Sequence, residues 1–289
     1  MVYEVERVRD GKSFVTRTVQ ARQRGRCIFT TTLSFMREGS GGELMVEHQN
    51  SMPRDVEEPP GGSEKSGLGN ASMGGDDGST PFESVRCKVF RGVGGKPEEK
   101  RTRYWIRARG RISDGHAESE ALEDPAAAPS KRDNHQAHLS ALAYMSDSFF
   151  IGTVALVHNL IRFSARSTIE STLKKFQGSD KERNELRAQM EKLGREEEEE
   201  YSRSRAGQPS REGPQKDLGM MVSLDHSIFF HNPRKFRADE WMLAEMNSPW
   251  AGEGRGLVLQ RIWSKDGVLI ATCTQEGLVR LKQQNDSKL

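Results

Sequence analysis

The chain has 289 residues, which is enough for two modest domains. Its formal net charge is +2, from 44 basic and 42 acidic residues, so nothing in the charge points to nucleic acid or another highly charged partner. Three cysteines give neither a disulfide framework nor the spacing of a metal site, which fits a reducing compartment, and we expect neither a metal nor a cofactor. The longest apolar stretch, 149–161, is interrupted by polar residues and is shorter than the roughly 18 residues that a membrane-spanning helix needs.

Residues 1–37 read as an antiparallel meander, which forms the first domain. Runs rich in β-branched and aromatic residues alternate with turn-forming pairs such as Asp10-Gly11 and Arg24-Gly25. The expected strands are 2–8, 14–23 and 27–36. Near the C-terminus, the stretches 256–264 and 268–282 repeat the two-strand part of this layout around another Asp-Gly turn. We therefore expect an internal repeat with one sheet in each copy.

Residues 38–100 are predicted to be a linker between the two domains. The segment is rich in Gly, Ser, Pro, Asp and Glu and includes Pro59-Pro60-Gly61-Gly62, a composition typical of a largely disordered chain. The second domain is then expected over 101–284, with a highly charged insertion at about 164–217 to which we assign no chemistry. A tail at 285–289 follows.

The second domain is expected to begin with a strand at 104–112 that alternates two kinds of side chain. Arginines occupy one face, and Tyr104, Ile106 and Ala108 occupy the other. Arginines interleaved with aromatic residues are also found on RNA-binding surfaces. A half-buried strand with a solvated basic face explains the pattern better, so we expect no nucleic-acid partner.

A helix is predicted at about 138–150. At helical spacing Leu139, Leu142 and Phe150 share one apolar stripe, and Asp147 lies on the same stripe. A carboxylate on the buried face of a helix is costly unless another group pairs with it or uses it. Asp147 is therefore a candidate functional residue, and the ordinary alternative is an aspartate that bonds to backbone amides at a helix end.

Two strands carry the other polar candidates. The run 222–231 is rich in strand-forming residues and includes Ser223, and a later strand places Gln275 among small residues on the face where the helix is expected to pack. A buried glutamine needs partners for its amide, which Asp147 and Ser223 would supply. The residues alone do not favour Ser223 over Ser227.

The histidines of the same run do not indicate a metal site. His226 and His231 lie five residues apart on a predicted strand and therefore face opposite sides. We expect His226 to support the structure or line a pocket rather than act as a base. The chain also lacks a Gly-x-Ser-x-Gly elbow, which argues against a serine nucleophile of the α/β-hydrolase type.

Several segments together resemble the acyl-CoA thioesterase II family. The matching stretches are Ala143 to Asp147, Ser223 to His231 and Thr274 to Gly277, with weaker matches at Arg9 to Phe14, Glu47 to Gln49, Met52-Pro53 and Tyr104 to Arg107. They follow the order of the family over most of the chain, apart from the two insertions. The resemblance implies an α+β fold, a double hotdog in which each antiparallel sheet wraps a central helix.

In that family an aspartate, a serine or threonine, and a glutamine position the water that hydrolyses the thioester. By motif position these residues correspond to Asp147, Ser223 and Gln275. The resemblance therefore implies that an acyl-CoA substrate is hydrolysed to free fatty acid and coenzyme A by direct attack of that water. Only the second half is expected to be catalytic, since a rough overlay places Leu33 of the first copy at the position of Gln275.

The start of the chain departs from the family. A hotdog wraps a long helix in its sheet, whereas Met1 opens directly in what should be a middle strand, so we predict that the first hotdog is truncated. Its sheet would then expose one apolar face, which predicts homo-oligomers or aggregation.

The last three residues, Ser287, Lys288 and Leu289, match the peroxisomal import signal, which a receptor reads at a free carboxyl end. We expect binding to that receptor and a location in the peroxisomal matrix. Peroxisomes degrade long-chain and branched acyl-CoA, so the signal and the family resemblance agree from independent residues.

Two other functions are compatible with parts of the sequence. A hotdog enoyl-CoA hydratase pairs an aspartate with a histidine on one helix, but no histidine follows Asp147 within helical reach. A catalytically defective fragment that binds acyl-CoA is the second alternative, because the first hotdog is expected to be incomplete. Binding without turnover would identify it.

Overall fold

The computed structural model of the chain describes residues 1–59, 81–87, 95–113, 134–148, 150–158, 160 and 218–283, and a few positions between 169 and 195. The chain forms two compact units, residues 1–49 and residues 50–289. Most of the predicted insertion, the middle of the predicted linker and the C-terminal tail lie outside the described residues. No helix in the described part of the chain is long and apolar enough to cross a membrane.

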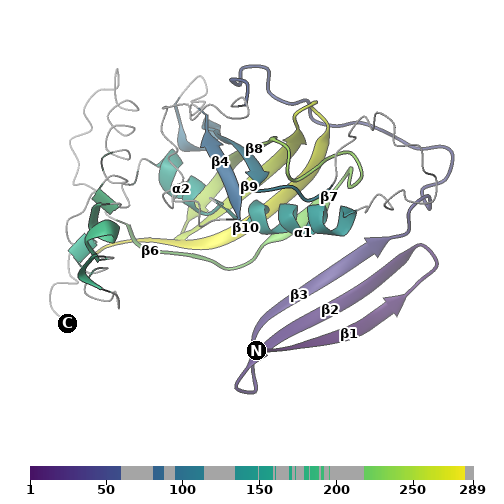
Figure 1. Ribbon diagram of the computed structural model, residues 1–289, viewed down its shortest axis with the longest axis horizontal. Helices are drawn as coiled ribbons and strands as arrows, with labels where there is room; N and C mark the ends of the chain where they lie inside the picture. The colour runs from purple at the N-terminus through teal and green to yellow at the C-terminus, as the bar shows by residue number, and fades with distance from the viewer. Residues whose placement is uncertain are drawn as a thin grey trace, which may run out of the picture. The chain divides into compact units, whose positions relative to one another are not determined.

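The first unit is a three-stranded antiparallel sheet in the order β1-β2-β3 (Figure 1). Its strands are β1 (Val2–Asp10), β2 (Phe14–Gln23) and β3 (Arg26–Met36), which confirms the three predicted strands. The register aligns Tyr3 with Ala21 and Phe29 on one apolar face, where the Tyr3 side chain is 66% exposed. Residues 1–49 are all described and contain no helix, so no helix of this unit covers that face.

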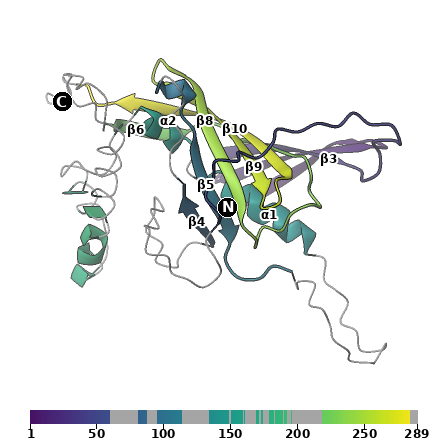
Figure 2. The ribbon, with the colours of Figure 1, turned by 90° about the horizontal axis from the view of Figure 1, so that it is seen from above.

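The second unit contains a seven-stranded antiparallel sheet in the order β4-β5-β8-β9-β10-β6, with β7 also paired to β10. Its strands are β4 (Phe82–Arg86), β5 (Thr102–Ala108), β6 (Leu218–Ser223), β7 (Ser227–Phe230), β8 (Met242–Gly252), β9 (Arg255–Ser264) and β10 (Leu269–Leu281). Its helices include α1 (His135–Ser146) and α2 (Gly152–Val157), and a 3-10 turn spans Pro97–Glu99. Figure 1 and Figure 2 both show α1 along one face of the sheet, as expected for a hotdog.

The main core lies between this face of the sheet and the two helices. Strand alternation makes the face apolar, and its buried side chains pack against those of α1 and α2. The core includes Ile106, Ala244, Ile262, Cys273, Leu142 and Val154. Burial raises the pKa of the Cys273 thiol to about 12, so this cysteine is a packing residue rather than a nucleophile.

Two glycines allow α2 and the residue before it to lie close to the sheet. Gly256 and Gly277 are paired across β9 and β10. A Cβ atom at Gly256 would lie 2.7 Å from Val154 Cγ2, and one at Gly277 would lie 2.6 Å from Ile151 Cδ1. Real side chains do not tolerate such distances, so the glycine pair sets how closely the helical segment approaches the sheet.

The opposite face of the sheet is covered as well, which corrects the expectation of a solvated basic face. Trp105 and Trp263 are buried there, and their indole N–H groups donate to the backbone oxygens of Glu57 and Asn50, each at 2.9 Å. Arg103 on the same face is only 8% exposed. Its guanidinium donates to Glu245 and to Asp55, at 2.6 Å and 3.0 Å.

These contacts also correct the predicted linker at 38–100. Residues 50–57 lie across the outer face of the sheet, with Met52 and Val56 packed against its small core. The short strand β4 pairs with β5, where Val85 lies opposite Trp105. The second unit therefore includes residues well before 101, although a glycine-rich composition surrounds them.

Candidate active site

Gln275 is the centre of the candidate site. Its side chain is 1% exposed and lies on the face of β10 that packs against α1, as the sequence predicted. Its amide Nε2 donates a hydrogen bond of 2.6 Å to Asp147 Oδ1. The structure therefore joins two of the three predicted residues, which lie 128 positions apart in the chain.

The position of Asp147 differs from the one predicted. The buried residues of α1 are His138, Leu142, Met145 and Ser146, so the apolar face does not follow the expected stripe. The helix ends at Ser146, and Asp147 follows it as the C-terminal cap with its side chain 61% exposed. Asp147 is thus not a carboxylate on the buried face of a helix but one at the helix end that reaches back to β10.

His226 is a third polar side chain in the site. Its Nε2 lies 2.9 Å from Ser146 Oγ, and its Nδ1 lies 3.5 Å from Gln275 Nε2 and 3.8 Å from Asp147 Oδ1. Its ring contacts Phe150 edge to face, with 5.3 Å between centroids. Burial lowers the pKa of His226 below its usual value, against the opposing effect of the charges on Asp147 and Asp225, which favours the neutral ring.

A β-bulge explains how His226 reaches this position. The predicted run 222–231 is two strands, and the backbone N–H groups of Leu224 and Asp225 both donate to the carbonyl of Glu276, at 2.9 Å and 3.4 Å. The N–H of Glu276 in turn donates to Asp225 Oδ1 at 2.9 Å. Because the extra residue shifts the alternation of side chains, residues on either side of it face the same way.

The register places Ser223 on the face of the sheet that carries Gln275. Ser223 lies opposite Gly277, two residues along β10 from Gln275, whereas Ser227 lies opposite Thr274 and points to the other face. Ser223 is exposed, and within the described residues its hydroxyl forms no hydrogen bond with Asp147 or Gln275. Histidine, not serine, is the second neighbour of the Gln275 amide.

The two ends of the Gln275 amide differ in their partners. The nitrogen end faces Asp147 and His226, but Oε1 is buried and has no hydrogen-bond partner among the residues that the structure describes. A buried carbonyl without a donor is costly. A water or a substrate group that donates to Oε1 would remove this cost.

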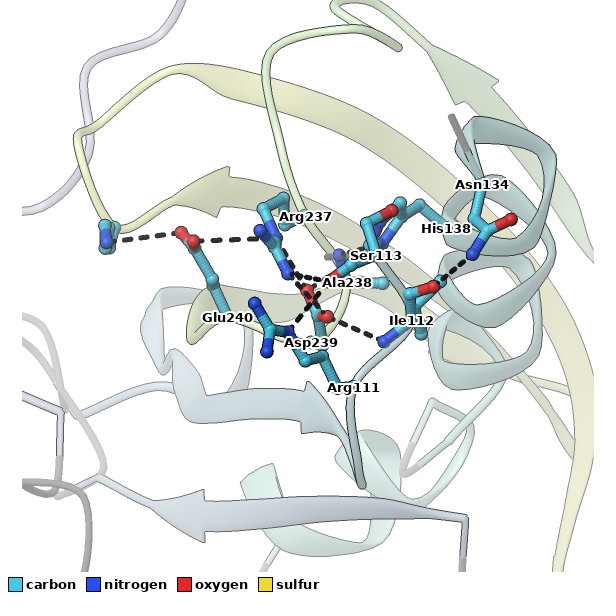
Figure 3. Close-up of polar contacts among 10 residues, drawn as sticks. Arg111, Ile112, Ser113, Asn134, His138, Arg237, Ala238, Asp239 and Glu240 are labelled. Carbon is cyan, nitrogen blue, oxygen red and sulfur yellow. Dashed lines mark hydrogen bonds and ion pairs between the residues drawn. The ribbon is translucent and has the colours of Figure 1, made fainter. Parts of the chain in front are cut away.

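A second buried polar cluster surrounds the first turn of α1 (Figure 3). Ser113 Oγ lies 2.8 Å from His138 Nε2, and His138 Nδ1 lies 4.0 Å from Asp239 Oδ1, a combination that suggests a catalytic triad. The N–H of Ala238 donates to His138 Nδ1 at 3.0 Å, so Nε2 carries the ring hydrogen and donates it to Ser113. His138 therefore cannot accept the proton of Ser113 in this arrangement, and the cluster is structural.

Within the described residues, no group of three His, Cys, Asp or Glu side chains could hold a metal ion.

Comparison with known proteins gives a consistent picture. Residues 1–36 match the profile of the acyl-CoA thioesterase N-terminal domain, and residues 53–279 match that of the C-terminal domain. The chain is 30% identical to acyl-coenzyme A thioesterase 8 of Mus musculus, in an alignment that covers 100% of this chain and 71% of that protein. The Homo sapiens protein of the same name is also 30% identical, with the same coverage.

The similarity extends to a solved structure. The crystal structure of acyl-CoA thioesterase II TesB2 from Mycobacterium marinum superposes with a TM-score of 0.54 at 26% sequence identity. The superposition covers 98% of this chain and 74% of that one. The profile matches span most of the sequence and the relatives align over all of it, so this chain belongs to the acyl-CoA thioesterase II family of thioester hydrolases and has that family's double-hotdog fold.

Proposed function

We propose that this chain hydrolyses acyl-CoA to free fatty acid and coenzyme A with a water held by Asp147, Ser223 and Gln275. The observation that carries the proposal is the 2.6 Å hydrogen bond from Gln275 Nε2 to Asp147 Oδ1. This bond occupies one carboxylate oxygen and leaves the other for the water. Because the Asp147 side chain is 61% exposed, a substrate can reach it.

In the proposed reaction, Asp147 accepts a proton from the water while the water oxygen bonds to the thioester carbonyl carbon. Gln275 Oε1 accepts the second hydrogen of the water, and in this proposal the Ser223 hydroxyl, which lies on the same face of the sheet, donates to the water oxygen. The carbon–sulfur bond of the tetrahedral intermediate then breaks, and the proton on Asp147 passes to the leaving sulfur. A thiol has a pKa of about 8.5, so no strong general acid is needed.

The oxyanion of the intermediate is assigned to backbone N–H groups rather than to Gln275. Both N–H bonds of the Gln275 amide point to acceptors within the site, Asp147 Oδ1 and His226 Nδ1. Neither is left to stabilise a developing negative charge on the substrate.

The test is the release of free coenzyme A from palmitoyl-CoA, compared between the unmodified chain and Asp147→Asn. Asparagine keeps the shape and still accepts from Gln275 but cannot take a proton, so we expect kcat to fall by about 100-fold or more. Asp225→Asn is the matched control, because its amide oxygen can still accept from the Glu276 N–H and the bulge is kept. Equal activity of Asp147→Asn and the unmodified chain would remove Asp147 from the mechanism.

One observation keeps enoyl-CoA hydration as a second candidate reaction. The structure places His226 Nδ1 3.8 Å from Asp147 Oδ1, so Asp147 has a histidine neighbour although none follows it on its own helix. The His226 ring is directed to Ser146 and Gln275 rather than to open space, which favours hydrolysis. Assaying crotonyl-CoA hydration alongside thiol release separates the two reactions. A folded chain that binds acyl-CoA and performs neither reaction is the non-catalytic binder.

The proposed location is the peroxisomal matrix, from Ser287, Lys288 and Leu289 at the end of the sequence. These residues lie outside the described part of the structure. A fluorescent protein joined ahead of Met1 should carry the chain into peroxisomes and leave it cytosolic when the three residues are removed. Import of the shortened chain would show that another signal is used.

Self-association is proposed from the first unit. The apolar face that carries Tyr3 and Phe29 is highly exposed, and surfaces of this kind usually mark contact sites. Sedimentation velocity should show a mass above 32.5 kDa that falls with dilution. A single species at the mass of one chain, at all concentrations, would contradict this proposal.

A further inference from the structure

We propose that His226 is a positioning residue whose unprotonated Nδ1 holds the Gln275 amide so that its carbonyl oxygen is left for the attacking water. The proposal deepens the hydrolase function proposed above and rests on it. It is carried by a chain of hydrogen bonds that runs from the backbone of α1 through Ser146 and His226 to Gln275. Each donor and acceptor in this chain can be assigned.

The assignment begins at Ser146. Its hydroxyl donates its single hydrogen to the carbonyl of Ala143 at 2.8 Å. Ser146 Oγ must therefore be the acceptor in its 2.9 Å contact with His226 Nε2, which carries the hydrogen. A neutral imidazole has only one N–H, so Nδ1 of His226 is left as an acceptor, and it faces Gln275 Nε2 at 3.5 Å.

The neighbours of Gln275 then fix the orientation of its amide. Asp147 Oδ1 and His226 Nδ1 are both acceptors, and both face the same end of the side chain. The NH₂ group satisfies both of them, whereas the carbonyl oxygen at that end would meet two lone pairs. Oε1 is therefore turned away, buried, and without a donor among the described residues.

His226 is better suited than Asp147 to hold this orientation. The Asp147 carboxylate is mostly exposed and, in the proposed reaction, takes up a proton at every turnover. His226 is anchored at both ends of its ring, by Ser146 through Nε2 and by Phe150 through an edge-to-face contact. The histidine thus keeps the amide in place while the charge on the aspartate changes.

Protonation of His226 would reverse the arrangement. An N–H at Nδ1 would face the N–H of Gln275, and the amide would have to turn its oxygen toward the ring and away from the water. The charged groups that face His226 are Asp147 at the end of α1 and Asp225 beside it in the bulge. Arg255 Nη1 donates a hydrogen bond of 2.8 Å to Glu276 Oε1 on β10, so this carboxylate is already paired. Burial outweighs the two aspartates and lowers the pKa of His226, so the neutral form predominates at neutral pH.

Two substitutions of nearly equal size separate the roles of the two ring nitrogens. His226→Asn places an amide oxygen near the position of Nδ1 and keeps the acceptor toward Gln275. His226→Gln places an amide nitrogen near the position of Nε2 and keeps only the donor toward Ser146. We expect His226→Asn to retain kcat within about threefold and His226→Gln to lose about tenfold, with KM unchanged in both.

The pH profile provides a readout that a merely structural role would not move. Asparagine does not titrate, so the ratio of kcat for His226→Asn to kcat for the unmodified chain should rise as the pH falls through the pKa of His226, which burial holds below its ordinary value. Matched circular dichroism and thermal unfolding show whether both variants fold. If the folded variants lose kcat equally, or if the ratio does not change with pH, the positioning role is wrong.

A measurement in the resting protein separates this inference from the proposed function. Nitrogen NMR of the His226 ring at neutral pH should show a protonated Nε2 and a bare Nδ1. The opposite tautomer or the doubly protonated ring would overturn the inference whether or not the chain is active. An inactive, folded chain with the expected tautomer would instead overturn only the hydrolase proposal.

Discussion

Strand register, rather than residue type, decides which serine shares a face of the sheet with Gln275. Ser223 and Ser227 lie in the same short run, but Ser223 is opposite Gly277 and Ser227 is opposite Thr274. Neighbouring residues of β10 point to opposite faces, so only Ser223 shares a face with Gln275. A water that donates a hydrogen bond to Gln275 Oε1 therefore lies on the face of the sheet that carries the Ser223 hydroxyl, and not on the face that carries the Ser227 hydroxyl.

This selection gives a residue-scale prediction. Ser223→Ala should lower kcat/KM for palmitoyl-CoA by about tenfold, because one hydrogen bond to the water is lost. Ser227→Ala, which removes the same hydroxyl from the other face of the sheet, should leave kcat/KM unchanged. Steady-state release of coenzyme A measures both variants. If Ser227→Ala has the larger effect, the water is not held on the face of Gln275.

The site residues illustrate how far single residues could be predicted. Asp147 and Gln275 do meet, but the reason given for Asp147 was wrong, since the helix ends before it. The proximity of His226 was not predicted, because alternation along an unbroken strand places His226 and Ser223 on opposite faces. Only the bulge at Leu224 and Asp225 brings both to the same face, and its two backbone hydrogen bonds to one carbonyl leave no signature in the sequence.

Among the elements, the contact between α2 and the sheet depends on a pair of small residues. Gly256 and Gly277 lie side by side on β9 and β10, and Ile151 and Val154 occupy the space above them. The same segment follows closely on Asp147 in the chain. A shift of the helical segment would therefore also move the end of α1 and the carboxylate that Gln275 holds.

An alanine at Gly277 tests this contact. Its Cβ would lie 2.6 Å from Ile151 Cδ1, so Gly277→Ala should lower the free energy of unfolding by about 1–3 kcal/mol. Urea unfolding measures this loss. In a chain that already carries Ile151→Ala, which empties the space, Gly277→Ala should lower the free energy of unfolding by clearly less. The difference between the two losses is the coupling energy of the pair. Additive effects would show that Ile151 does not limit the approach of α2.

Some alternating strands could be predicted from the sequence, whereas β4, β8 and the packed segment 50–57 were not predicted. The strands of the first unit, as well as β9 and β10, have enough apolar residues at a spacing of two to be recognised. Strand β4 has only five residues and follows a glycine-rich segment, so its composition suggested a linker. Residues 50–57 pack without forming a helix or strand, which leaves no periodicity to find.

At the scale of the second unit, the cluster around Asp239 connects segments that are far apart in the sequence. Asp239 accepts hydrogen bonds from Arg237 and from the N–H of Ile112, at 2.9 Å and 2.8 Å (Figure 3). Asn134 donates to the carbonyl of Ile112, and His138 accepts from the backbone beside Asp239. The end of β5, the start of α1 and the loop before β8 are thus held together by one carboxylate and its neighbours.

This cluster makes the stability of the protein depend on acid pH. Burial raises the pKa of Asp239, but the hydrogen bonds from Arg237 and the Ile112 N–H outweigh it and lower the pKa to about 2. The folded pKa therefore lies below the unfolded value of about 3.9, so the unfolded chain binds the proton first. Asp239 contributes about 2 kcal/mol of stability above roughly pH 4, which is lost as the pH falls toward 2.

Urea unfolding tests this dependence. The difference in unfolding free energy between the unmodified chain and Asp239→Asn should shrink as the pH falls across this range. Arg237→Gln should narrow this pH range, because it removes the hydrogen bond that lowers the pKa of Asp239 most. If the difference in unfolding free energy between the unmodified chain and Asp239→Asn stays constant from pH 6 to the acid end of this range, the Asp239 carboxylate has the same pKa in the folded and the unfolded chain.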